Sequence, residues 1–118
     1  MSTKTSESWA SDPQARALRV EVSSERSLLL PFDQFSYSEL ISEGKEQRLR
    51  LVFTSHEVVI RGHALRRLET VMQRMELAFV TTTPGDHRSL TAEGQPVIVE
   101  IVVTEVGPPN QSSQASKE

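Results

Sequence analysis

Two stretches of alternating residues, separated by two positions, constrain the fold more than any other feature of the sequence. Apolar side chains occupy every second position in "QRLRLVFT" (47–54), and "EVVIRG" (57–62) repeats the pattern around Val58 and Ile60. Such alternation is typical of strands with one buried face. The two stretches are therefore expected to form a hairpin.

The register of this hairpin depends on its loop. With a two-residue loop, Phe53 faces Val58 and the apolar side chains of both strands share one face. The same register places Arg50 directly opposite Arg61, and like charges in that position are destabilising. The loop sequence Ser-His lacks the Gly or Asn that a two-residue turn prefers, so a four-residue loop is the alternative.

After the hairpin the apolar spacing changes from two residues to three and four. This helical spacing predicts an amphipathic helix at about 64–78. A strand at 77–83, where β-branched residues gather, is the alternative for the end of that segment. The apolar stripe consists of Leu65, Leu68, Met72, Met75 and Phe79.

Further strands are expected on both sides of this unit. Alternation predicts one at 18–22, and the aromatic residues of 34–42 favour a strand over a short helix begun by Asp33. The leucines before Pro31 are extended but unsuited to a central strand. The continuous apolar run 96–106 indicates a central strand with both faces covered. Together these elements predict an α+β domain: a small meandering antiparallel sheet of about four to six strands with one helix packed on it.

The apolar residues also set the domain boundaries. All 31 Leu, Ile, Val and Phe residues lie between Leu18 and Val106, so a single domain is expected at 18–106. Residues 1–17 and 107–118 are polar and are predicted to be a disordered arm and tail. Trp9 is the exception in the arm: it is either solvated or docked on the domain or on a partner. We expect the core to include Leu51, Phe53, Val58, Ile60, Leu68, Met72 and Ile101.

Several classes of function are disfavoured by what the sequence lacks. There is no cysteine, which excludes disulfides and thiolate metal sites, and the three histidines are not spaced as metal ligands. We find no nucleophile motif and no phosphate-binding loop, so no catalytic residue, metal or cofactor is assigned and an enzyme is not expected. No apolar run is long enough to span a membrane, and a cytoplasmic protein is the expectation. A core of this size is small, so self-association would add stability.

Positive charge is concentrated in one part of an acidic chain. Residues 48–67 hold five arginines and one glutamate, whereas the whole chain carries a net charge of −3. One interpretation is an anion or nucleic-acid site at an uncapped helix start after Gly62. The other is a solvated face whose arginines are neutralised by Glu21 or Glu100 on neighbouring strands. The candidate binding residues are Arg48, Arg50, Arg61, His63, Arg66 and Arg67.

The sequence therefore predicts a non-catalytic interaction or assembly module that associates with itself. The runner-up is a protein that binds nucleic acid or phosphate through the arginine-rich hairpin and helix start. The acidic balance and the few aromatic residues near the arginines argue against the runner-up. If the strongly β-forming run 97–103 instead lay at a sheet edge, it could pair with another chain.

Overall fold

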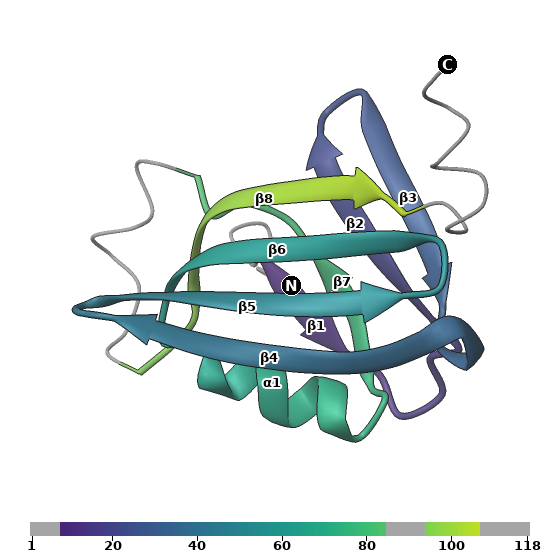
Figure 1. The fold of residues 1–118 in the computed structure, drawn as a ribbon, viewed down its shortest axis with the longest axis horizontal. Helices are drawn as coiled ribbons and strands as arrows, with labels where there is room; N and C mark the ends of the chain where they lie inside the picture. Colours follow the sequence, from purple (N-terminus) through teal and green to yellow (C-terminus); the bar gives the residue numbers. More distant parts are fainter. Residues whose placement is uncertain (1–7, 85–93, 107–118) are drawn as a thin grey trace, which may run out of the picture.

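The computed structural model describes residues 8–84 and 94–106, and within them the chain forms eight strands, one α-helix and one short 3-10 turn (Figure 1). The strands are β1 (Trp9–Ser11), β2 (Ala17–Ser23), β3 (Arg26–Pro31), β4 (Phe35–Glu43), β5 (Glu46–Phe53), β6 (His56–His63), β7 (Leu77–Val80) and β8 (Val97–Glu105). The helix α1 spans Arg66–Gln73 and the 3-10 turn spans Phe32–Gln34. The predicted α+β class is confirmed.

The strands form two four-stranded sheets. Sheet A has the order β1-β7-β2-β3, and sheet B has the order β4-β5-β6-β8. Neighbouring strands are antiparallel except β2 and β7, which are parallel. The strand count exceeds the expected four to six for two reasons: β1 lies in the segment expected to be a disordered arm, and the leucines before Pro31 form β3. β7 is the strand given as the alternative for the end of the helical segment.

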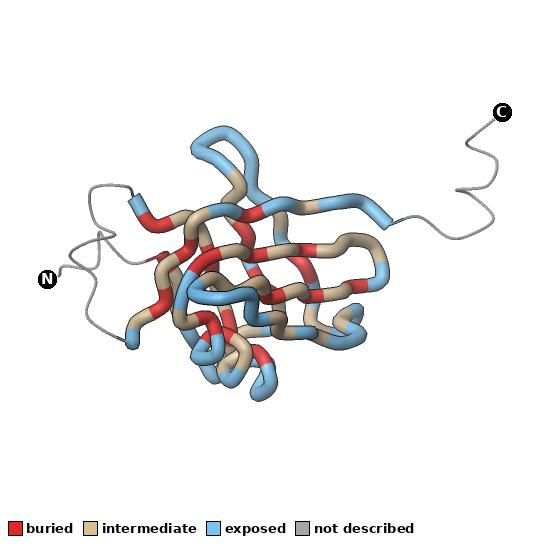
Figure 2. The backbone as a smooth tube through the Cα atoms, turned by 60° about the vertical axis from the view of Figure 1, so that its left-hand side comes forward, coloured by how far each residue is buried: buried red, intermediate tan, exposed pale blue. Residues whose placement is uncertain are grey.

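The core lies between the two sheets and is closed by α1. Figure 1 shows sheet B in front of sheet A with α1 below β4, and Figure 2 shows that buried positions recur along the strands. All seven core residues expected from the sequence are buried. The core consists of Leu18, Val20, Leu30, Leu49, Leu51, Phe53, Val58, Ile60, Leu65, Leu68, Met72, Leu77, Val80, Ile98 and Ile101.

The helix is shorter than predicted. It ends at Gln73, and the alternative of a following strand is correct, because β7 starts at Leu77. Ala64 and Met75, on either side of α1, both adopt the left-handed backbone conformation with φ of 57°. These two residues turn the chain into and out of the helix. Met75 is consequently exposed instead of continuing the buried stripe.

The hairpin β5–β6 adopts the four-residue loop. Val52 pairs with Glu57, so the two-residue register is wrong by two positions. A shift of two keeps every side chain on its predicted face, because the side-chain period of a strand is also two. It does change the neighbours of the arginines: Arg48, not Arg50, lies opposite Arg61.

β4 is a strand, as predicted, but its faces change along its length. The β4–β5 register shifts between Phe35 and Tyr37. This bulge leaves Ser36 without a partner on β5, so Phe35 packs against the core while Tyr37 is exposed. The two rings therefore lie on opposite faces of β4 although they are two residues apart.

β8 is an edge strand, not the central strand that its apolar run suggested. It pairs with β6 on one side only, and Val102 remains 45% exposed on the outer side of the sheet. Apolar content alone does not place a strand, because valine is favoured in strands at any position. The last part of the run, Ile101 and Val103, points toward the core.

The N-terminal segment is folded from Ser8 onward, which corrects the expectation of a disordered arm over residues 1–17. β1 pairs with β7, and Trp9 packs against the core with the guanidinium of Arg67 5.8 Å from its ring centroid. Docking of Trp9 on the domain, one of the two alternatives, is therefore the observed one. The predicted tail 107–118 lies outside the described residues, as do residues 85–93.

Candidate functional site

The outer face of sheet B is the surface on which charged side chains converge. It is formed by the side chains that point away from the core. Along each strand these side chains alternate with the buried ones. We call these residues the outer face. They are Tyr37, Glu39, Ile41 and Glu43 on β4; Glu46, Arg48, Arg50 and Val52 on β5; Glu57, Val59 and Arg61 on β6; and Glu100, Val102 and Thr104 on β8.

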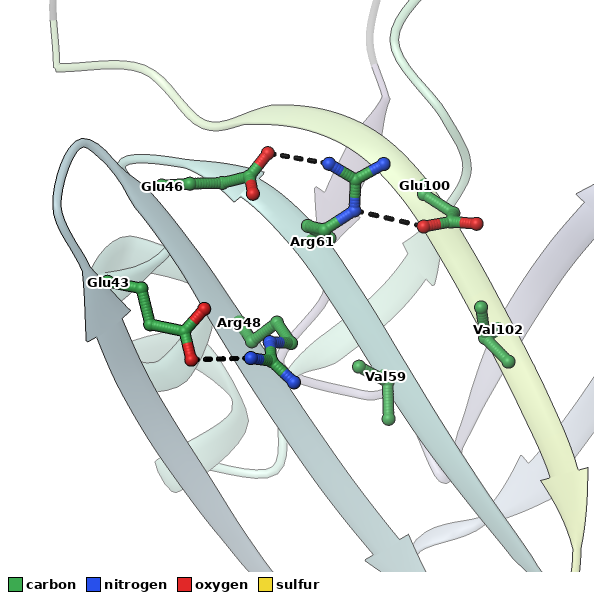
Figure 3. Close-up of a pocket in the computed structure, with 7 residues that line it drawn as sticks. All are labelled: Glu43, Glu46, Arg48, Val59, Arg61, Glu100 and Val102. Atoms are coloured by element: carbon green, nitrogen blue, oxygen red, sulfur yellow. Dashed lines mark hydrogen bonds and ion pairs between the residues drawn. The ribbon is translucent and has the colours of Figure 1, made fainter.

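Arg61 links three strands of this face. Its Nη1 donates to Glu46 Oε2 on β5 at 2.6 Å, and its Nε donates to Glu100 Oε1 on β8 at 2.9 Å (Figure 3). Next to it, Arg48 Nη2 donates to Glu43 Oε2 across the β4–β5 turn at 2.5 Å. Two adjacent arginines are thus each held by carboxylates, which offsets the repulsion of their cross-strand pairing.

These charges border a shallow depression of about 350 Å³. Its apolar lining comes from Val59 and Val102, which lie to one side of the ion pairs in Figure 3. The remaining lining residues are the five charged ones just described. The depression is therefore apolar on one side and bordered by groups whose charges are already paired.

Arg50 forms a second set of contacts further along the sheet. Its guanidinium is hydrogen-bonded to Glu57, lies 3.5 Å from Glu39 Oε1 and donates to the hydroxyl of Tyr37 at 3.2 Å. It also lies over the Tyr37 ring, 5.8 Å from the centroid. This arginine, too, has acidic partners on both neighbouring strands, and it has an aromatic partner on β4.

The electrostatic state of the face follows from these pairs. Hydrogen bonding and the positive charge of Arg48 hold the pKa of Glu43 below its ordinary value. The pKa values of Arg48, Arg50 and Arg61 are raised, chiefly by their hydrogen bonds to Glu43, Glu57 and Glu100 respectively. Three arginines and five glutamates give the face a net charge of −2.

The six candidate anion-binding residues do not converge on one point. Arg48, Arg50 and Arg61 lie on the outer face, whereas α1 packs its buried residues into the core on the other side of the sheet. On α1, Arg66 Nη1 lies 3.8 Å from Glu69, and Arg67 lies over Trp9. Arg61 and Arg66 are therefore paired with different carboxylates.

The helix start itself is also different from the expected one. Gly62 belongs to β6, and α1 begins only at Arg66. The Leu65 N–H donates to the side-chain oxygen of Gln47 at 2.7 Å. His63 lies at the end of β6, with its Nδ1 2.9 Å from the carbonyl oxygen of Lys45. A β5 side chain thus satisfies one of the donors that the anion hypothesis left open.

Of the two glutamates proposed to neutralise the arginines, Glu100 does so and Glu21 lies on β2 in the other sheet. The remaining acidic partners were not predicted; they are Glu39, Glu43, Glu46 and Glu57. For Glu43 and Glu46, the sequence feature that could have revealed them is the short β4–β5 turn at Gly44. This turn brings the two glutamates opposite each other and next to the arginines. Recognising these partners also requires the correct β5–β6 register, which places Arg48 opposite Arg61.

Comparison of the chain with protein-family models, with curated protein sequences and with solved structures gave no match. Within the described ranges, no three His, Asp or Glu side chains gather closely enough to hold a metal ion. In the same residues, no helix has the length and apolar content needed to cross a membrane. The function proposed below therefore rests on the geometry of sheet B.

Proposed function

We propose that the protein is a non-catalytic interaction module that assembles with copies of itself through sheet B. The observation that carries this proposal is the outer face, where apolar residues lie exposed or half-buried between charges that already have partners. Tyr37 and Val102 are the most exposed apolar residues of this face, at 49% and 45%. Apolar surface between charged pairs is typical of protein contacts.

The pairing of the arginines favours a protein partner over a phosphate. A phosphate that bound Arg61 would have to displace Glu46 or Glu100, or approach the carboxylates at close range. Such an arrangement, with a net negative face, lowers the affinity for anions. A protein surface with both signs of charge could instead add to the existing pairs.

The experiment is sedimentation velocity on the full chain over a wide range of protein concentration, at low and high salt. We expect the sedimentation coefficient to rise with concentration as the monomer associates. A parallel melting experiment uses inorganic phosphate and a random oligonucleotide at low salt, and we expect no rise in Tm. A chain that stays monomeric and melts higher with phosphate or oligonucleotide would overturn the proposal in favour of anion binding.

A further inference from the structure

The four sheet edges of the described chain differ in how far they are protected from pairing with another chain. β1 is three residues long, β3 begins at Arg26 and ends at Pro31, and β4 carries a bulge and lies beside α1. Short strands, prolines, charges and bulges are the usual devices that protect an edge. β8 has nine residues, and from Glu100 onward it has no bulge or proline; its charged residues, Glu100 and Glu105, lie at the two ends of this run.

The direction of the backbone groups of β8 follows from one hydrogen bond. The Val106 N–H donates to the Ser55 carbonyl across the β6–β8 ladder at 2.8 Å. In an antiparallel strand the N–H and C=O groups of one residue point to the same side, and those of the next residue point to the opposite side. The N–H and C=O groups of Ile101, Val103 and Glu105 therefore point away from β6, toward the free edge.

The beginning of β8 is already paired on that edge. The Thr83 N–H donates to the Ile98 carbonyl at 2.8 Å, and the Ile98 N–H donates to Thr83 Oγ1 at 2.9 Å. The register shift between Arg61 and Gly62 of β6, opposite Ile98 to Glu100, changes the direction of the β8 backbone at this point. The accessible edge is thus the run from Glu100 to Val106, with three outward residues.

We propose that two copies of the chain pair through this run, with their β8 strands antiparallel about a two-fold axis at Val103. This inference rests on the proposed self-association and specifies its interface. The two copies of sheet B then form one continuous eight-stranded sheet. A two-fold axis makes the same surface of both copies face each other, so one strand supplies both halves of the interface.

The position of the axis follows from the backbone groups. With the axis at Val103, all three outward residues face outward residues of the second copy: Val103 faces Val103, and Ile101 faces Glu105. If the axis lay at Val102, the outward backbone groups of Glu105 would have to pair with Val99 of the second copy. Val99 lies next to Ile98, whose backbone is already bonded to Thr83. An axis at Thr104 would pair only Val103 with Glu105 within the described residues.

The side chains fit the same register. Glu100 faces Val106 of the second copy and Val102 faces Thr104, so no two carboxylates lie directly opposite each other. Val102 also has the second copy's Val102 and Val106 as diagonal neighbours, within reach of side-chain contact. Val102 and Val106, which are 45% and 41% exposed in one chain, thereby gather into one apolar cluster.

The first test uses the absence of cysteine in the chain. Residues 102 and 104 would face each other in a pair without mutual hydrogen bonds, where Cα atoms lie about 4.5 Å apart, which suits a disulfide. The single variants Val102→Cys and Thr104→Cys are each purified, then incubated alone and mixed in a glutathione redox buffer. We expect a disulfide-linked dimer from the mixture and little from either variant alone.

The alternative registers give different products. Cross-linking of Val102→Cys alone indicates an axis at Val102, cross-linking of Thr104→Cys alone indicates an axis at Thr104, and either result overturns the proposal. Leu29→Cys, at an exposed position on sheet A, is the control, and it should form no disulfide with either variant. All three positions are exposed, so the variants are expected to fold, which their melting curves check.

The second test changes the charge opposite Glu100. Val106→Glu places like charges opposite each other twice in the dimer and should raise its dissociation constant roughly two- to thirty-fold, whereas Val106→Lys should lower it. Sedimentation at low salt measures both. If the wild type associates but neither variant changes its dissociation constant, the β8 interface is wrong while the proposed function stands. If the wild type does not associate, the proposed function itself fails.

Discussion

Phe53 has the largest of the fully buried side chains in the core between the two sheets. Its side chain is 1% exposed, and its ring packs edge-on against Phe35 with centroids 5.3 Å apart. We expect Phe53→Ala to lower the free energy of unfolding by about 3–5 kcal/mol. Urea unfolding measures this loss. Leu29→Ala, on the exposed side of β3, is the control and should change stability by less than about 0.5 kcal/mol; equal losses would contradict the assigned faces.

Gly62 is required for the close approach of β6 to β8. A Cβ atom at this position would lie 1.9 Å from the Val97 carbonyl oxygen, and the neighbour is backbone, which cannot move away as a side chain can. We expect Gly62→Ala to destabilise the protein by about 3 kcal/mol.

The control for this substitution is at Gly44, in the β4–β5 turn. Gly44 has φ of +66°, and a Cβ there would meet nothing within 4 Å. Asn adopts this left-handed conformation more readily than other side chains, so Gly44→Asn should change the unfolding free energy by less than about 1 kcal/mol. Similar thermal midpoints for the Gly62→Ala and Gly44→Asn variants would show that β8 can move away from β6.

At the scale of the elements, β1 stabilises the domain although it has only three residues. Trp9 packs against the core, the Thr81 N–H donates to the Ser8 carbonyl, and the Asp12 N–H donates to the Glu76 carbonyl, both at 2.8 Å. These contacts connect β1 to both ends of β7. The strand therefore adds apolar burial and hydrogen bonds that the polar composition of the segment did not indicate.

Deletion of residues 1–12 should consequently lower stability by about 2–3 kcal/mol, mainly through the loss of Trp9 burial. Deletion of residues 1–7 leaves all of these contacts in place and is the matched control. Thermal unfolding followed by far-ultraviolet circular dichroism compares the two truncated chains. Since Trp9 is the only tryptophan, its fluorescence in the full chain should change at the same urea concentration as the dichroism. An earlier fluorescence change would mean that β1 detaches before the domain unfolds.

For the whole molecule, acidification should weaken the ion pairs of the outer face. The pKa of Glu43 is lower in the folded chain than its ordinary value of 4.5, because Arg48 stabilises the carboxylate. The folded state therefore gains stability above the ordinary pKa and loses it as the pH falls through the lowered one. We expect the wild type to be more stable than Glu43→Gln at neutral pH, with the difference disappearing in acid.

Urea unfolding as a function of pH measures this difference. The effect requires Arg48, so in an Arg48→Gln background the Glu43→Gln substitution should no longer produce the same pH dependence. High salt should reduce the difference at neutral pH as well, because both side chains are about half exposed. A pH-dependent difference that persists without Arg48 would assign the lowered pKa to another cause.

Local patterns explain which parts of the fold could be predicted. The inner faces of β5 and β6 follow from alternation, and Leu68 and Met72 follow from helical spacing, because these periods reflect backbone geometry within a few residues. The end of α1 was less predictable. The stripe continues in sequence to Phe79, but the left-handed conformation at Met75 and the pairing of β7 with β2 end the helix earlier.

The candidate site was predictable only in its composition. The concentration of arginines is evident in the sequence, and so is Glu100 as a possible partner of Arg61. Their actual arrangement depends on the hairpin register. A shift of two residues leaves the buried face unchanged but gives the charged side chains of β5 and β6 new cross-strand neighbours. The apolar pattern is therefore the same for both registers and could not distinguish between them.

By itself, the sequence determined the α+β class, the buried side of the central hairpin and the excess of arginine over acid in that region. Only the tertiary structure decided that β8 lies at a sheet edge, that Trp9 joins a sheet, and that Arg61 connects Glu46 with Glu100. The physical reason is the range of the interactions. Periodicity reports the burial of one face of an element, whereas strand order and register depend on contacts between residues that are far apart in the chain.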